Sequence, residues 1–291
     1  MPINSAHRSA LYVPASNTRA IEKSAVIEAD WIIFDLEDSV SREDKVSARQ
    51  ALVKAFSARD HHPFGKSLTA IRCNATDTEY FAADLETIAA CRPEALLLPK
   101  VSSTQDVAIF TRQAESVSLD NSIASWFMIE TARGIAQLER IVEEGIATSW
   151  PLQTLVVGHN DIASETGVSL ESDRKYLVPW LMQIVLQAKQ QGLQVLDSVW
   201  NNFRDLDGFK REASQAKMMG FDGKTLIHPG QVEPANHLFM PSEKELLRAR
   251  AIVLAFAGNE DKNVLSLDGE MVERLHLEQA MRLLEKFGTL Q

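Results

Sequence analysis

The stretch Trp31-Ile-Ile-Phe-Asp-Leu-Glu-Asp38 is an apolar run that ends in acidic residues. Seven more short apolar runs occur along the chain, and most are closed by a charged or polar residue. The eight runs cover residues 9–14, 31–35, 68–72, 95–100, 126–130, 155–161, 194–197 and 224–228. Stretches long enough for a helix lie between them. Such eightfold alternation predicts an α/β fold, a closed parallel (β/α)8 TIM barrel.

The gaps between the runs predict the helices of this barrel. Expected helices cover 18–28, 41–57, 104–117, 132–146, 172–191, 205–219 and 230–239, and one more opens at 76. Ser16-Asn17-Thr18 and Ser103-Thr104 are helix-start signals. We therefore expect a TIM-barrel catalytic domain over residues 1–240. Residues 241–291 form a C-terminal helical extension, with helices at 242–256 and 271–287, that could cover a neighbouring subunit's active site.

Composition excludes several classes of protein. Of 291 residues, 45% are hydrophobic, which is enough for a core, and 40 acidic against 30 basic residues give a net charge of -10. This charge argues against a nucleic-acid partner but permits a small anionic ligand beside a local basic patch. Cys73 and Cys91 form no CxxC motif. With no signal-peptide pattern and no run near ~20 apolar residues, we expect a cytoplasmic protein without a membrane span.

The residues that close the runs are candidates for chemistry, because barrel active sites lie at the carboxyl ends of the strands. Asp35 and Arg72 end neighbouring runs, and so do Glu130 and Asp161. Two adjacent carboxylates repel each other unless they are protonated or bridged by a cation. Carboxylates with waters are common ligands of Mg²⁺. With Lys100 beside Arg72, the pattern predicts a cation next to an anion-binding side chain.

Each candidate also has a structural interpretation. Asp35 and Arg72 could form a structural ion pair, and Glu130 and Asp161 could each cap a helix. Their joint position on neighbouring strands favours metal binding. The other polar residues have simpler expected roles. Lys100 could lie at the rim, His228 is structural, and His159 supports the metal ligands or makes a loop contact rather than binding the metal. Asn74 shares the face of Arg72, Cys73 faces the helices, and His61 and His62 face solvent.

Seven motifs in order along the chain resemble those of citrate lyase beta-subunit-like proteins, a branch of the HpcH/HpaI aldolase superfamily. The nearest likeness is to malyl-CoA and citramalyl-CoA lyases. The motifs are Arg8-Ser-Ala-Leu-Tyr-Val-Pro-Ala-Ser-Asn17, Phe34-Asp-Leu-Glu-Asp-Ser-Val40, Ile71-Arg-Cys-Asn74, Leu97-Leu-Pro-Lys-Val101, Met128-Ile-Glu-Thr-Ala-Arg-Gly134, Gly158-His-Asn-Asp161 and Ile227-His-Pro-Gly-Gln231.

The resemblance implies a Mg²⁺-dependent enzyme that cleaves or forms a carbon–carbon bond beside a thioester. Its substrate would be a 3-hydroxyacyl-CoA such as malyl-CoA or citramalyl-CoA, and its products an acyl-CoA and a 2-oxo acid. The resemblance also favours a homo-oligomer, in particular a trimer. By the same resemblance, each functional residue has a role: Glu130 and Asp161 bind the metal, Glu130 and Arg72 contact the substrate, Asp35, Glu37 and Asp38 support the metal waters and the arginine, and Arg19 and Lys23 lie near the coenzyme A phosphates.

The C-terminal arm departs from the family pattern. The family carries Asp-Gly-x-Met-[Ile/Val]-Asp-x-Pro, and this chain reads Asp268-Gly-Glu-Met-Val-Glu273-Arg-Leu275. In the lyases the second aspartate reaches a neighbouring subunit's site as an acid/base, so Glu273 is the candidate here. Its extra methylene could move the proton by about an ångström, and such a shift can reduce a rate roughly a hundredfold.

Three other functions remain open at this point. The chain could be a citrate lyase beta subunit whose substrate is carried on an acyl-carrier protein. It could be an aldolase in which Lys100 forms a Schiff base. It could also be a catalytically weak homologue that binds a 2-oxo acid, which the altered arm motif favours.

Overall fold

A computed structural model of the chain describes residues 6–57, 64–171, 173–259 and 262–288. The chain divides into two compact units, one spanning His7–Leu238 and the other beginning at Phe239. His61 and His62 lie outside the described residues, so the expectation that they face solvent stays a prediction.

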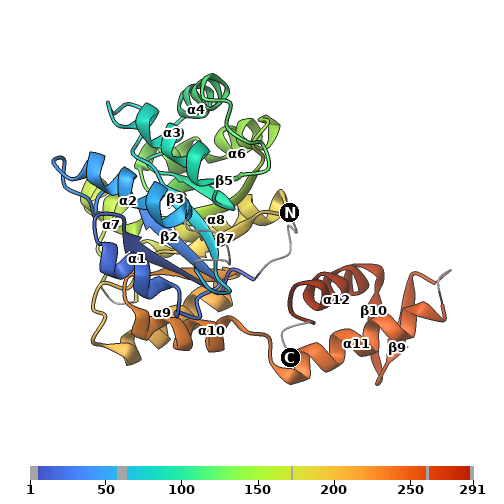
Figure 1. The fold of residues 1–291 in the computed structure, drawn as a ribbon. Helices are drawn as coiled ribbons and strands as arrows, with labels where there is room; N and C mark the ends of the chain where they lie inside the picture. Colours follow the sequence, from blue (N-terminus) through green and yellow to red (C-terminus); the bar gives the residue numbers. More distant parts are fainter. Residues whose placement is uncertain (1–5, 58–63, 172, 260–261, 289–291) are drawn as a thin grey trace. The chain divides into compact units, whose positions relative to one another are not determined.

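The first unit is a closed barrel of eight parallel strands, which confirms the predicted fold (Figure 1). Each strand pairs with the next along the chain, and the last strand pairs with the first. The register places Asp35 opposite Arg72. The strands are β1 (Ser9–Pro14), β2 (Trp31–Asp35), β3 (Leu68–Arg72), β4 (Ala95–Leu98), β5 (Ala124–Ile129), β6 (Leu152–Val157), β7 (Gln194–Asp197) and β8 (Gly223–Leu226).

Helices follow the strands and surround the barrel (Figure 1). They are α1 (Thr18–Ser24), α2 (Lys45–Ser57), α3 (Phe81–Cys91), α4 (Thr104–Ser116), α5 (Ala132–Ala136), α6 (Leu138–Ala147), α7 (His159–Thr166), α8 (Val178–Gln190), α9 (Leu206–Met219), the 3₁₀ turn η1 (Pro229–Gln231) and α10 (Val232–Phe239). Asn17 caps α1 by accepting from the Ala20 amide, and Ser103 with Asp106 forms a capping box for α4. Both predicted helix starts are therefore confirmed.

Several predicted helices differ in extent. The helix expected over 132–146 is broken at Gln137 into α5 and α6. The helix expected to open at 76 begins at Phe81, and the one expected from 172 begins at Val178. Helix α7 is an additional element between β6 and α8.

Side chains fill the inside of the barrel. The interior cluster contains Ala10, Trp31, Ile33, Ala70, Ala95, Leu97, Ala124, Trp126, Met128, Val156 and Leu196. The rings of Trp31 and Trp126 lie 4.5 Å apart, and the His7 ring lies 5.1 and 5.3 Å from them. These rings pack around the beginning of the strands, so the barrel is a packed core rather than a pore.

The second unit is not purely helical, which corrects the expectation for the arm. It contains α11 (Glu243–Ala257), the antiparallel strands β9 (Val264–Leu267) and β10 (Glu270–Glu273), and α12 (Arg274–Phe287). Asp268 and Gly269 join the strands, both with positive φ (52° and 82°). Asp-Gly is a favoured pair for a two-residue hairpin of this kind. The helix predicted over 271–287 therefore begins at Arg274.

Candidate functional site

An ion pair at the carboxyl end of β2 and β3 is the central feature of the site. Arg72 Nε and Nη2 donate to the two carboxylate oxygens of Asp35 at 2.6 and 2.7 Å. Both side chains are buried. Asp35 also accepts from the backbone amides of Glu37 and Ser39. Burial raises the pKa of Asp35, but the Arg72 charge and these hydrogen bonds outweigh burial and hold that pKa below its usual value.

The turn after β2 adds two more carboxylates to this pair. Glu37 Oε2 lies 2.9 Å from Arg72 Nη1, and Glu37 Oε1 lies 2.6 Å from Lys100 Nζ. The exposed Asp38 carboxylate lies 3.4 Å from the same ammonium group. Glu37 is buried, and burial raises its pKa despite the two cations. Asp35, Glu37, Asp38, Arg72 and Lys100 therefore form one network.

Lys100 has a more definite position than the predicted place at the rim. Burial lowers its pKa, but the hydrogen bond and charge of Glu37, with the charges of Asp38 and Glu130, raise it above the usual value. Its side chain is therefore protonated at neutral pH, and a protonated amine is not a nucleophile. This argues against a Schiff base at Lys100.

Glu130 follows β5 directly and is fully buried. Its Oε1 accepts from the Lys100 backbone amide at 2.7 Å, and Lys100 has a positive φ of 54°. Its Oε2 finds no hydrogen-bond partner among the described residues. A Cβ at Gly158 would lie 2.5 Å from that oxygen, so glycine at this position leaves room for the carboxylate. Burial, together with the charges of Glu37 and Asp161, raises the pKa of Glu130 well above its usual value.

The sequence predicts that Asp161 closes the sixth strand. In the structure it lies instead in the first turn of α7, beyond the end of β6. The strand ends at Val157, and Gly158 caps the helix that follows. Asp161 is partly buried and close enough to Glu130 for its charge to raise the pKa of that carboxyl group. Glu130 therefore lies at the end of a strand and Asp161 at the start of a helix, and the charge of Asp161 acts on Glu130.

Glu130 and Asp161 fit a divalent cation. A buried carboxylate with one oxygen lacking a partner is stabilised by a positive charge, and the hard oxygen donors suit Mg²⁺. Within the described ranges, no group of three or more His, Cys, Asp or Glu side chains is arranged to hold a metal ion. The protein would therefore supply two carboxylates, and waters or substrate oxygens would complete the shell.

Tyr12 supports Arg72 from inside the barrel, a contact that sequence analysis did not predict. The guanidinium carbon lies 4.9 Å from the centre of the Tyr12 ring, and the Tyr12 hydroxyl lies 3.9 Å from Met128 Sδ. Burial raises the pKa of Tyr12, with Arg72 opposing, so its hydroxyl is neutral at physiological pH. The ring stacks a planar cation and helps to orient it.

Lys45 is a second residue that the sequence analysis missed. Its buried ammonium group donates to the carbonyls of Leu36 and Glu37, both at 2.7 Å, and to Asn74 Oδ1 at 2.8 Å. Asn74 also donates to Asp84 of α3 at 2.6 Å. Asn74 therefore lies against the helices and not beside Arg72 as predicted, because β3 ends at Arg72 and the alternation of faces stops there. Lys45 holds the backbone of the acidic turn.

A buried charge network lies beside α7. Lys224 donates to Asp197 at 2.6 Å and to Glu212 at 2.8 Å, and Arg174 donates to Asp197 at 2.8 Å. Burial raises the pKa of Asp197, but Lys224 and Arg174 outweigh burial and lower it. His159 Nδ1 lies 2.5 Å from Ser198 Oγ. Burial and the charges of Lys224 and Arg174 lower the pKa of His159 to about 4, so this ring is neutral at pH 7.

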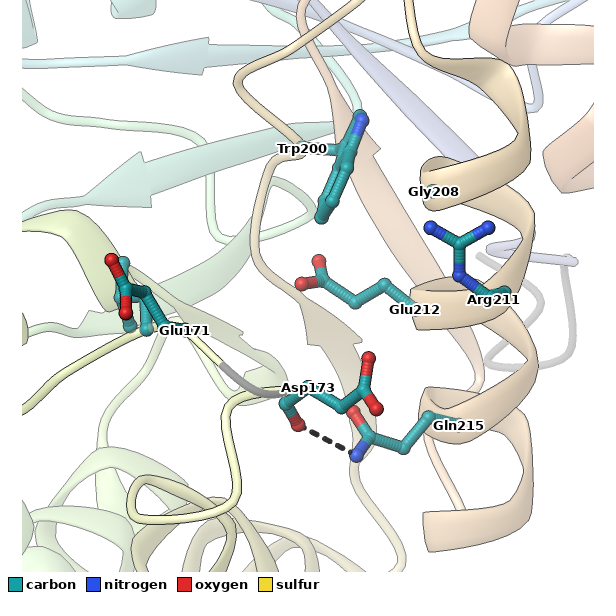
Figure 2. A pocket seen from close by; sticks show the side chains of 8 residues that line it. Glu171, Asp173, Trp200, Gly208, Arg211, Glu212 and Gln215 are labelled. Atoms are coloured by element: carbon teal, nitrogen blue, oxygen red, sulfur yellow. Dashed lines mark hydrogen bonds between the residues drawn. The ribbon is translucent and has the colours of Figure 1, made fainter.

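A cavity of about 430 Å³ is lined in part by Glu212 of this network (Figure 2). In Figure 2 the Glu212 side chain points into the space between Trp200 and Asp173. Gln215 Nε2 donates to the Asp173 carbonyl at 2.9 Å. None of the site residues predicted from sequence lines this cavity. It is therefore a feature separate from the Arg72 and Glu130 cluster.

Three predicted residues lie outside the cluster. Arg19 and Lys23 are exposed, about one turn apart on α1, which follows β1. Glu273 belongs to the second unit, where it ends β10 and caps α12, and its amide donates to His276 Nδ1 at 2.9 Å. Their predicted roles stay predictions.

Comparisons with known proteins agree with this architecture. The (3S)-malyl-CoA thioesterase of Cereibacter sphaeroides is 38% identical over 281 residues, covering 96% of this chain and 94% of that protein. Citrate lyase subunit beta of Haemophilus influenzae is 31% identical over 287 residues, 96% of each. The crystal structure of CitE from Mycobacterium tuberculosis with magnesium, acetoacetate and coenzyme A matches 98% of this chain and 99% of that one, with a TM-score of 0.72 and 27% identity.

The chain is a (β/α)8-barrel protein. At the carboxyl end of its strands, where barrel enzymes have their active sites, an arginine is held by a buried carboxylate. The family model described as HpcH/HpaI aldolase/citrate lyase matches residues 8–229, and the chain belongs to that family. None of the helices in the described part of the chain is long and apolar enough to cross a membrane.

Proposed function

We propose that this protein is a Mg²⁺-dependent carbon–carbon lyase acting on 3-hydroxyacyl-CoA esters that carry a carboxylate, such as malyl-CoA or citramalyl-CoA. Cleavage gives an acyl-CoA and a 2-oxo acid, and the reverse reaction joins them. The observation that carries the proposal is Arg72, fixed by Asp35 in the same cluster as a buried Glu130 oxygen without a hydrogen-bond partner among the described residues. The family and the magnesium and coenzyme A complex of a structural relative support it.

Glu130 and Asp161 would hold the metal ion, which when bound supplies Lewis-acid polarisation of substrate oxygens. Arg72 binds the oxygens of the 2-oxo acid portion and stabilises negative charge there as the carbonyl forms. Asp35 accepts one N–H from Nε and one from Nη2, and Nη1 faces Glu37 Oε2 and Met128 Sδ, so the second N–H of Nη2 is the proposed donor to the substrate. Glu37 and Asp38 keep Lys100 beside the site. Their carboxylates would also orient the waters of the metal ion.

The remaining groups act on the thioester half of the substrate. Cleavage leaves a thioester enolate that needs a proton, and Glu273 of a second copy is the proposed general acid. This role requires a homo-oligomer, and the family resemblance favours a trimer. Arg19 and Lys23 form an exposed basic pair suited to the coenzyme A phosphates. With only two cysteines, Cys73 and Cys91, the chain suggests no disulfide framework, and we propose a cytoplasmic location.

A second candidate function is hydrolysis of the thioester. The relative with 38% identity over 96% of this chain is a (3S)-malyl-CoA thioesterase. In that reaction water attacks the thioester carbonyl, and coenzyme A leaves as the free thiol. The same metal and arginine would bind the substrate, so the two reactions differ in products and not in the site that binds the acid.

The test is a product assay on malyl-CoA and citramalyl-CoA with Mg²⁺ or EDTA. A lyase releases glyoxylate or pyruvate without free thiol, whereas a thioesterase releases thiol without a 2-oxo acid. Glu130→Gln and Asp161→Asn should each abolish the Mg²⁺-dependent reaction. Asp207→Asn is the matched control, because this exposed carboxylate, like Asp161, lies in the first turn of a helix that follows a barrel strand.

Retained full activity in both variants would overturn the metal assignment. Failure of the native protein on every free coenzyme A ester, with activity on acyl-carrier-protein thioesters, would make it a citrate lyase beta subunit. Tight binding of a 2-oxo acid without any turnover would make it a binding protein.

A further inference from the structure

Two pairs of side chains join the start of α7 to the segment that follows β7. His159 Nδ1 lies 2.5 Å from Ser198 Oγ, and both residues are buried. One residue further along, Asn160 Nδ2 donates to Asn201 Oδ1 at 3.2 Å, and Asn201 Nδ2 donates back to Asn160 Oδ1 at 2.8 Å. We call these two pairs the α7 clamp.

The residue that follows the clamp on α7 is Asp161, one of the two proposed metal ligands. It lies in the first turn of a helix of 8 residues. The N-cap of this helix is Gly158, which has no side chain to accept a capping hydrogen bond. Glu130, by contrast, follows a barrel strand directly. The position of Asp161 therefore depends on what holds the first turn of α7.

The first turn of α7 is anchored toward both neighbours of β6 in the barrel. The Gly158 amide donates to the Ile129 carbonyl at 3.1 Å, which joins this turn to the end of β5. The α7 clamp joins the same turn to the segment after β7. Because β5 and β7 flank β6, the two anchors hold Asp161 from opposite sides.

The segment after β7 is a firm support for the clamp. Thr225 Oγ1 donates to the Asp197 carbonyl at 3.0 Å, and buried Gln231 Nε2 donates to the Trp200 carbonyl at 3.1 Å. Each of these carbonyls belongs to the residue immediately before a clamp residue. The clamp is therefore attached to backbone that β8 and η1 already hold in place.

A carboxylate that binds Mg²⁺ must be held precisely, because this ion demands a nearly ideal octahedral shell. Residues that orient metal ligands commonly contribute roughly ten- to a hundredfold to metal affinity. We propose that the α7 clamp positions Asp161 for the divalent cation, so that its four members are positioning residues and not ligands. This inference rests on the proposed function, which assigns Asp161 to the metal.

The experiment removes the half of the clamp that follows β7, so that the sequence of α7 stays native. The double variant Ser198→Ala, Asn201→Ala is titrated with Mn²⁺, which prefers the same oxygen ligands, and the free ion is measured by EPR. We expect the dissociation constant to rise about tenfold. In the product assay, the Mg²⁺ concentration for half-maximal rate should rise by the same factor. The kcat at saturating Mg²⁺ should stay near the native value, because saturating metal restores the binding-competent position.

Two control variants separate positioning from stability. Ser125→Ala removes a buried hydroxyl that donates to the Trp150 carbonyl at 2.8 Å, near the beginning of β5 and so at the other end of the barrel. It should lower Tm and leave the Mn²⁺ dissociation constant unchanged. Asn202→Ala changes an exposed asparagine next to Asn201 and should change neither quantity.

Mn²⁺ binding by Asp161→Asn separates this inference from the proposed function. If that variant binds Mn²⁺ with native affinity, Asp161 is not a ligand, and the metal assignment fails together with the inference. If Asp161→Asn weakens binding but the double variant of the clamp does not, the inference alone is overturned. An equal loss of affinity in Ser125→Ala would also overturn it, because reduced stability would then account for the effect.

Discussion

Asp35→Asn separates the two roles of the ion pair with Arg72, stability and catalysis. The substitution keeps the size of the side chain but removes the charge that faces a buried guanidinium at 2.6 and 2.7 Å. An amide has only one acceptor oxygen, whereas Asp35 accepts from Arg72 and from the amides of Glu37 and Ser39. The variant therefore loosens both the arginine and the acidic turn.

The expected loss of stability depends on the burial of the ion pair and on the contact between Glu37 and Arg72 that remains. Removing one partner of a buried ion pair costs about 3–5 kcal/mol. Glu37 still lies 2.9 Å from Arg72, so we expect the lower end of that range. For a barrel of this size, about 3 kcal/mol lowers Tm by roughly 6–12 °C. An arginine displaced by an ångström reduces kcat/KM on the coenzyme A ester about a hundredfold.

Asp30→Asn is the matched control at the opposite end of the same strand. Asp30 immediately precedes β2 and accepts from Arg8 Nε and Nη2 at 2.9 and 2.6 Å, the same forked geometry. It should lower thermal stability by about 2 kcal/mol and leave kcat/KM unchanged. Thermal melts and the product assay test both variants. If Asp35→Asn lowers Tm but retains native kcat/KM, the arginine needs no fixed orientation, and our reasoning about the site is refuted.

Three further predictions address the other buried charges. Glu130→Gln removes a carboxylate whose pKa burial raises, so we expect a higher Tm in EDTA and no further rise with Mg²⁺; an unchanged Mg²⁺ response in thermal melts would exclude Glu130 as a ligand. Lys224→Met leaves Asp197 and Glu212 facing Arg174, so urea unfolding should show a loss of about 3–5 kcal/mol. Adding Glu212→Gln should recover part of that loss, and simple additivity would contradict a shared network. Because the pKa of His159 falls from 6.5 to about 4 on folding, protonation favours the unfolded chain. The free energy of unfolding therefore does not depend on this group above pH 6.5, and it falls by about 3 kcal/mol as the pH is lowered to 4. In urea titrations at each pH, His159→Gln should remove this dependence.

The strands could be predicted from sequence because a polar residue ends many of the apolar runs. The bounds of β2 and β3 agree with the predicted runs, which end at Asp35 and Arg72. The sixth predicted run, 155–161, is longer than the strand, which ends at Val157. In Val-Val-Gly-His-Asn-Asp161 no charged residue precedes Asp161, so the sequence does not mark the end of the strand at Gly158. A glycine that ends a strand and caps a helix looks the same in sequence as one within a loop. The sequence therefore predicts Asp161 at a strand end, whereas the structure places it in the first turn of α7.

Two of the residues that sequence analysis missed, Lys45 and Lys224, are buried cations whose side-chain partners lie far along the chain. Lys45 bonds Asn74, 29 residues away, and Lys224 bonds Asp197, 27 residues away. A lysine in a helix or strand is normally exposed, and only tertiary contacts reveal one that is not. The arm hairpin is a different case, because the Asp268-Gly269 pair that turns the chain also belongs to a family motif, and the motif alone does not predict strands on either side.

The charges at the carboxyl end of the barrel favour the proposed metal ion. Asp35, Glu37, Asp38, Glu130 and Asp161 contribute five carboxyl groups, against the two cations Arg72 and Lys100. Both cations are already engaged by the first three carboxylates. Glu130 accepts only a backbone amide, and its second oxygen lacks a hydrogen-bond partner among the described residues. A substrate carboxylate would add further negative charge to this cluster. A divalent cation held by Glu130 and Asp161, as proposed, would offset that repulsion, so metal and acid should bind cooperatively, each raising the affinity for the other.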